Sequence, residues 1–193
     1  MDKGVHRLLY ITAILLMVFL ITWFFNLGET SLTHIKYGDS FHLVRDMPDK
    51  EEAAELMDEI KERLQMLVDY TSTNSTAERG MLLKNRFKEQ NIQETDVNDG
   101  GTSYSIDKGK EIHLCLRDKK TSRLHNINIL MFVSIHELAH VMSESYGHNG
   151  EFGDNFVYLL KQAVKLGIWQ NIDYSKNPEE FCGMKVDSNP LKT

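Results

Sequence analysis

The chain has 193 residues and a mass of 22.3 kDa, which is enough for one domain with its own hydrophobic core. Hydrophobic residues make up 41% of the sequence and charged residues 26%, so the composition excludes a disordered or fibrous protein. The formal net charge is -6, which argues against a nucleic-acid partner. Cys115 and Cys182 are too few for a disulfide framework, and whether they pair with each other or stay free is left open by the sequence.

The N-terminal segment is the most apolar part of the chain. Residues 8–25 carry no charge, and the uncharged stretch continues to Gly28. Because about twenty helical residues cross a bilayer core of roughly 30 Å, we predict a retained single-pass membrane anchor over residues 1–28. A cleaved signal peptide is the alternative. Two Lys or Arg residues precede the segment and one follows it, which favours a main domain on the non-cytoplasmic side.

The stretch that follows is predicted to begin irregularly and then to form helices. Residues 29–48 are interpreted as a stalk or lead-in. Asp49 can cap a helix whose apolar residues recur at helical spacing up to Val68. The TSTNST run at 71–76 is expected to end this helix, and a second helix is predicted over 77–88.

The hydrophobic period then changes to two, which is typical of β-strands. Residues 104–106 and 112–116 alternate apolar and polar side chains around an Asp107-Lys108-Gly109 turn, so we predict a β-hairpin. The basic run RDKKTSR at 117–123 is expected to form a solvated turn.

The segment 126–142 carries the chemical signal. Its apolar residues lie three or four apart, which predicts a helix packed into the core, and it contains the pattern His136-Glu137-Leu138-Ala139-His140. Histidines at i and i+4 share one helix face and can bind one zinc ion. Glu137 is displaced around the helix, where it can act on a water as the general base.

A catalytic zinc site needs a third protein ligand. We expect His148 to supply it, because Gly147 allows the chain to turn back before a second amphipathic helix begins near Phe152. Glu144 is the alternative ligand, although it lies two turns beyond His136. His113 and His125 are expected to remain outside the site.

Three segments together resemble a known family. IHLCLRD (112–118), SIHELAHVM (134–142) and GHNGEFGDNFVYLLKQAV (147–164) are similar to the WLM and SprT-like minimal zincin peptidases. The resemblance implies Zn²⁺ held by His136, His140 and His148, Glu137 as general base, and a protein or peptide substrate. It also makes the strand 112–116 a candidate edge strand for an extended peptide. The chain further resembles predicted membrane-anchored metallopeptidases of large DNA viruses, which implies a viral or virion membrane.

These observations lead to one prediction of fold and function. The fold class is α+β, with an N-terminal transmembrane helix followed by a small zincin-like domain over residues 49–193, in which helices pack on a short β-sheet. The predicted function is that of a membrane-anchored zinc endopeptidase with Glu137 as general base. The alternative is a non-catalytic, membrane-tethered binding module on the same scaffold.

Overall fold

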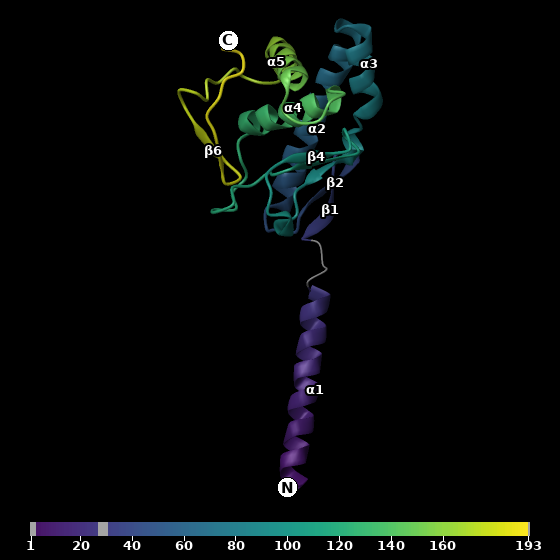
Figure 1. The fold of residues 1–193 in the computed structure, drawn as a ribbon, viewed down its shortest axis with the longest axis vertical. Coiled ribbons are helices and arrows are strands. Elements are labelled where there is room, and N and C mark those ends of the chain that lie inside the picture. Colours follow the sequence, from purple (N-terminus) through teal and green to yellow (C-terminus); the bar gives the residue numbers. More distant parts are fainter. Residues whose placement is uncertain (1–2, 27–30, 193) are drawn as a thin grey trace. The chain divides into compact units, whose positions relative to one another are not determined.

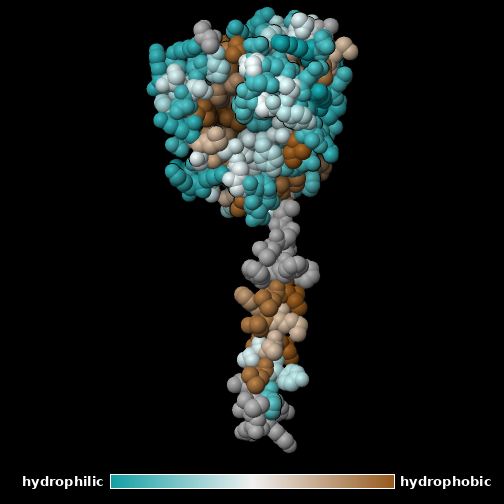
Figure 2. All heavy atoms as spheres, in the orientation of Figure 1, coloured by the Kyte–Doolittle hydropathy of each residue, from teal (hydrophilic) through white to brown (hydrophobic). Residues whose placement is uncertain are grey.

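The structure is a computed structural model that describes residues 3–26 and 31–192. The chain divides into two units, Met1–Ser31 and Leu32–Thr193. The first unit contains one helix, α1 (Lys3–Asn26), whose described side chains are mostly apolar and exposed (Figure 2).

The prediction of a single-pass membrane anchor is wrong. In the ranges 3–26 and 31–192, no helix combines the length and the apolar character that a membrane crossing requires. The predicted fold class is therefore wrong in its transmembrane helix, and the predicted membrane localisation is wrong as well. Residues 1–2 and 27–28 of the predicted anchor lie outside the described residues.

The unit Leu32–Thr193 mixes α-helices with three small β-sheets (Figure 1). Its elements in chain order are β1 (Leu32–Tyr37), β2 (Ser40–Arg45), α2 (Lys50–Asn74), α3 (Ala77–Arg86), β3 (Ile92–Glu94), β4 (Tyr104–Ile106), β5 (Glu111–Leu114), α4 (Ile127–Met142), α5 (Gly150–Lys165), β6 (Glu179–Phe181) and β7 (Met184–Val186), with short 3-10 helices at Glu89–Asn91 and Val97–Asp99.

The sheet nearest the site has three strands in the order β3-β5-β4. The predicted hairpin is confirmed, because β4 and β5 pair antiparallel with Ser105 opposite Ile112. The prediction that the strand at 112–116 lies at the edge of its sheet is wrong. β5 also pairs in parallel with β3, so it is the central strand and β4 lies at the edge.

The segment interpreted as a lead-in contains a β-hairpin. β1 and β2 pair antiparallel through all six residues of each strand, and they contact α2. Val44 of β2 is fully buried in the hydrophobic core. Residues 29–30 of the lead-in lie outside the described residues.

The predicted helix after Asp49 is present as α2, but it does not end at residue 71. Thr73 and Asn74 donate side-chain hydrogen bonds to the carbonyl oxygen of Tyr70, and buried Thr71 faces the core, so the polar run continues the helix. Asp49 occupies the N-cap position of α2 as predicted, but its side chain makes no capping hydrogen bond. Its carboxylate instead accepts a hydrogen bond from Arg117.

Arg117 is buried, which the prediction of a solvated basic turn missed. The guanidinium Nε of Arg117 lies 3.0 Å from Oε1 of the fully buried Glu94, at the end of β3. An unpaired charge at this depth would be strongly destabilising, so the ion pair accounts for the burial of both groups.

Helix α4 lies at the centre of the unit. It contacts α2, α3 and α5 as well as strands β4 and β5, and Figure 1 shows it between α5 and the strands. Eleven of its 16 residues are buried, which explains the nearly continuous apolar sequence. The helix begins where predicted, because the side chain of Asn126 accepts hydrogen bonds from the amides of Asn128 and Ile129.

Candidate metal centre

Helix α4 presents two histidines on one face. His136 and His140 are one helical turn apart, and their ring centroids are separated by 5.1 Å. Both rings lie against Phe152 of α5, which is itself buried. The apolar ring of Phe152 therefore limits the orientations that the two imidazoles can take.

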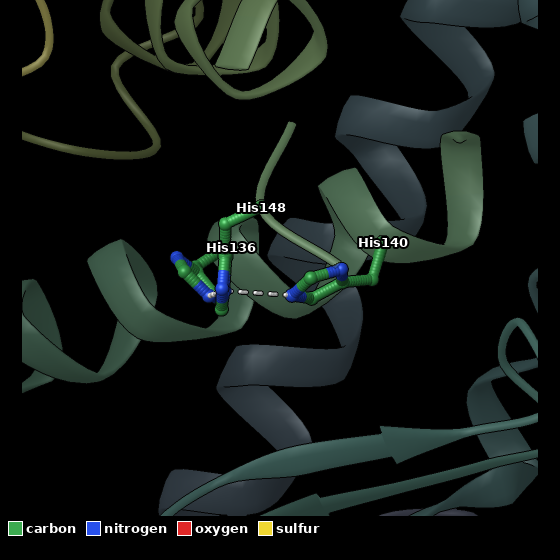
Figure 3. A group of neighbouring side chains, drawn as sticks. All are labelled: His136, His140 and His148. Atoms are coloured by element: carbon green, nitrogen blue, oxygen red, sulfur yellow. Dashed lines mark hydrogen bonds between the residues drawn. The ribbon is translucent and has the colours of Figure 1, made fainter. Parts of the chain in front are cut away.

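The third histidine comes from the loop that joins α4 to α5. Gly147 has a φ of +81°, a conformation that side chains other than glycine rarely adopt, and this turn brings His148 back over α4. The Nε2 atom of His148 lies 2.9 Å from Nε2 of His136 and 3.2 Å from Nε2 of His140 (Figure 3). One nitrogen from each of the three histidines thus points toward a common centre.

This arrangement is compatible with a bound metal ion. The ligating atoms of the three histidines lie within 4.8 Å of one another. Nitrogen atoms that hold one tetrahedral ion at 2.0–2.1 Å are about 3.3 Å apart, which is close to the two Nε2 separations given above. His136, His140 and His148 therefore fit a metal ion in both spacing and chemistry.

The surroundings favour the neutral forms of His136 and His140. Burial, assisted by the other two histidines, lowers the pKa of His136 to about 3. Burial also lowers the pKa of His140 to about 4, with His148 as the next cause. A metal ion binds the neutral form of imidazole, so little free energy is lost to deprotonation at neutral pH.

Glu137 follows His136 on α4 and lines the same cavity as the three histidines. Its side chain is buried, and burial raises its pKa to about 7 although a hydrogen bond with Ser105 of β4 acts in the opposite direction. A carboxyl group with a pKa near neutrality can both accept and return a proton.

Glu151, in the first turn of α5, holds the loop that carries His148. Its carboxylate accepts hydrogen bonds from the backbone amides of Glu144 (2.7 Å) and Ser145 (3.0 Å) and from the Ser145 hydroxyl group. These bonds lower the pKa of Glu151 to about 2. The sequence analysis missed this residue. The only signal was an acidic residue three positions after His148 at the start of a helix.

We expect Glu151→Gln to weaken metal affinity about 10–100-fold, because a glutamine side chain cannot accept all three of these hydrogen bonds. Asp154→Asn is the matched control, since Asp154 lies exposed on the same helix. The measurement is zinc affinity by competition with a chromogenic chelator. Equal affinities for the two variants would show that the loop is held without Glu151.

The three histidines line a cavity of about 540 Å³. One wall of this cavity is formed by residues from 102 to 108, in and around β4, and another wall by residues from 181 to 188, in and around β7. Figure 2 shows an apolar hollow on the surface of this unit. The cavity is therefore a cleft whose lining includes the three histidines and Glu137.

The other candidate ligands are not part of the described histidine cluster. Glu144 is exposed, and only its backbone amide takes part in the loop. His113 stacks on Tyr104 and hydrogen-bonds Gln93, while His125 packs against Phe181. These positions agree with the expectation that His113 and His125 lie outside the site.

The two cysteines form a disulfide bond, Cys115–Cys182, between residues separated by 67 positions. Cys115 follows β5, and Cys182 lies in the turn between β6 and β7. The bond therefore attaches the hairpin that forms one wall of the cleft to the sheet that supports the other wall.

Comparisons with known proteins identify viral relatives. No protein-family model matches the chain. It is 35% identical over 189 residues to the uncharacterized protein R325 of Acanthamoeba polyphaga mimivirus, an alignment that covers 93% of this chain and 96% of the relative. It is also 34% identical over 113 residues to the uncharacterized protein 136R of Invertebrate iridescent virus 6, with 57% of this chain and 62% of the relative covered.

Among solved structures, the chain is similar to Wss1 from Saccharomyces cerevisiae. A crystal structure of a Wss1 mutant has a TM-score of 0.48 and 21% sequence identity, and covers 65% of this chain and 91% of that chain. A second Wss1 crystal structure has a TM-score of 0.46 and 23% identity, with 62% and 85% covered.

The resemblance to proteins of large DNA viruses that the sequence predicted is thus confirmed, whereas the membrane anchor predicted with it is not. Since the alignment with the mimivirus protein extends over nearly the whole of both chains, the protein belongs to the family of mimivirus protein R325.

Proposed function

We propose that the chain is a zinc-dependent endopeptidase. The observation that carries this proposal is the convergence of three histidine Nε2 atoms in the lining of an open cleft, with the buried carboxyl group of Glu137 lining the same cleft. Three imidazoles are a donor set that suits catalytic zinc. The proposed ligands are His136, His140 and His148.

The side chains of the site have separate roles in this proposal. When bound, zinc would polarise the scissile carbonyl group and lower the pKa of a water molecule. Glu137 accepts a proton from the attacking water and delivers it to the leaving amine. Because Glu137 is buried with a pKa raised to about 7, it is suited to both transfers. The buried ring of Phe152 holds the imidazoles in place.

The strand that we propose for backbone pairing with substrate is β4. It is at the edge of its sheet and lines the cleft beside Glu137, whereas β5 is paired on both sides. An extended peptide can add to a free strand edge through main-chain hydrogen bonds. The proposed substrate is therefore an unfolded or extended segment of a protein.

Metal analysis combined with a cleavage assay tests the proposal. We expect the purified protein to contain about one zinc ion per chain and to cleave fluorescently labelled casein. Removal of the ion by 1,10-phenanthroline should abolish cleavage, and added Zn²⁺ should restore it. Zinc-loaded protein that leaves casein intact would instead support the binding module, and protein without zinc would contradict the peptidase proposal.

A further inference from the structure

The hairpin of β6 and β7 forms a wall of the cleft but takes no part in the metal centre. We infer that this hairpin, residues 179–188, selects the substrate, and that it accepts an extended polypeptide segment with a bulky apolar side chain. The inference rests on the proposed function and adds the class of side chain that the cleft accepts. Figure 1 shows the hairpin, in yellow, to one side of α4.

One end of the hairpin is fixed to the rest of the unit. Phe181 is buried, and its ring centroid lies 4.8 Å from that of His125. The Asn126 side chain, which caps α4, donates a 2.6 Å hydrogen bond to Glu179. Cys182 adds the covalent bond to Cys115. These contacts fix the position of β6, and of the turn between β6 and β7, relative to α4.

The other strand, β7, faces the cleft without a further partner strand. Among the described residues its sheet has only two strands, so one edge of β7 carries unpaired backbone groups. Met184 is 52% exposed and lines the cleft together with Lys185 and Val186. The wall therefore offers both a free strand edge and an apolar side chain.

The chemistry of the two walls indicates the occupant. β4 and β7 each have a free edge and residues of both strands line the same cleft; an extended polypeptide is the ligand whose amides and carbonyls match strand edges. Phe132 and Val133 of α4 also line the cleft and are apolar like Met184. The flexible thioether of Met184 can adapt to different apolar side chains. Lys185 and Asp187 bring opposite charges to the wall, so no preference for a charged substrate follows.

This division of roles gives a specific expectation for the disulfide bond. The three histidines and Glu137 lie on α4 and its following loop, whereas the bond holds the hairpin turn. Opening the bond should therefore weaken substrate binding while the metal stays bound.

The test compares Met184→Ala with Met66→Ala. Met66 lies on α2, and its side chain has a similar exposed fraction of 56%. The probes are quenched fluorescent decapeptides in which a single Leu or Phe is placed among Gly, Ser and Ala residues. We expect Met184→Ala to raise the KM about tenfold, since apolar contacts of this size change discrimination by that order. Its zinc content should match that of Met66→Ala, which should behave like the original protein.

A second measurement covers the disulfide bond. Full-length protein reduced with a phosphine, with both thiols confirmed by titration, should show the same rise in KM at unchanged zinc content. An unchanged KM in both Met184→Ala and the reduced protein would overturn the inference, and so would zinc loss from Met184→Ala.

The failure of the inference can be distinguished from failure of the proposed function. If the original protein cleaves no peptide, binding of the same peptides to it is measured by fluorescence anisotropy. If Met184→Ala weakens this binding, the hairpin remains the part of the cleft that selects the peptide. The peptidase proposal alone then fails. If both methionine variants cleave the peptides with the same KM, the peptidase proposal is supported and the proposed role of the hairpin is contradicted.

Discussion

Replacement of Glu137 by glutamine is expected to leave the metal in place and to reduce peptide hydrolysis by 10²–10⁴-fold. Glutamine keeps the size of the side chain but cannot accept the proton of the attacking water, and a positioned general base contributes a factor of this size. The loss corresponds to about 2.7–5.4 kcal/mol of transition-state stabilisation. The metal should remain because the three converging nitrogen atoms belong to histidines.

The measurement is kcat/KM on a quenched peptide, with zinc content and melting temperature determined on the same samples. Glu144→Gln is the matched control, because Glu144 is an exposed carboxylate close to the site along the chain. It should retain full activity. Equal cleavage by Glu137→Gln and the original protein would exclude Glu137 as the base, and loss of zinc would show that Glu137 helps to hold the ion.

Removal of the third imidazole should have the largest effect on metal binding. His148→Ala is expected to lose most of its bound zinc, because Nε2 of His148 lies within 3.2 Å of the corresponding atoms of both other histidines. Two nitrogen atoms alone do not complete a catalytic zinc site. Since His148 is exposed, the free energy of unfolding of the metal-free protein should change little.

Zinc per chain after dialysis gives the measurement, and circular dichroism of the metal-free protein checks the fold. Glu144→Ala serves as the comparison and should keep its zinc, because only its backbone amide contributes to the loop. The opposite result, zinc lost from Glu144→Ala and kept by His148→Ala, would make Glu144 the third ligand.

Helix α4 and the meeting of its histidines with His148 could be anticipated because the relevant signals are local. The apolar spacing of residues 127–141 determines a buried helix, and an i, i+4 pair must share a face of it. Gly147 marks a turn, and the turn limits where His148 can lie. Each inference needs only residues that are close along the chain.

The features that were missed depend on contacts between distant segments. β3 has only three residues, too few for a periodic pattern, yet its parallel pairing with β5 determines that β4 is the edge strand. The bond between Cys115 and Cys182, which the sequence left open, joins residues 67 positions apart. Burial of Arg117 depends on Glu94 and Asp49, neither of which is near it in sequence. Hydrophobic period and turn composition carry no information about such partners.

The N-terminal prediction failed for a different reason. Residues 8–25 are apolar enough to suggest a span and all of them lie in α1, so a run of uncharged residues was not sufficient evidence for a membrane-crossing helix. The described helix α1 ends at Asn26, and no described helix meets the requirement for crossing a membrane.

The packing of α4 also separates two kinds of evolutionary change. Neighbouring helices and strands enclose this helix, so a substitution that alters its volume would displace the histidines together with the core. The side chains of Met184 and Lys185 are exposed, so substitutions there are expected to change the stability of the fold little. With the proposed roles of the hairpin and the histidine cluster, a lineage could therefore exchange one set of target proteins for another by changing the hairpin, while the reaction itself is inherited unaltered.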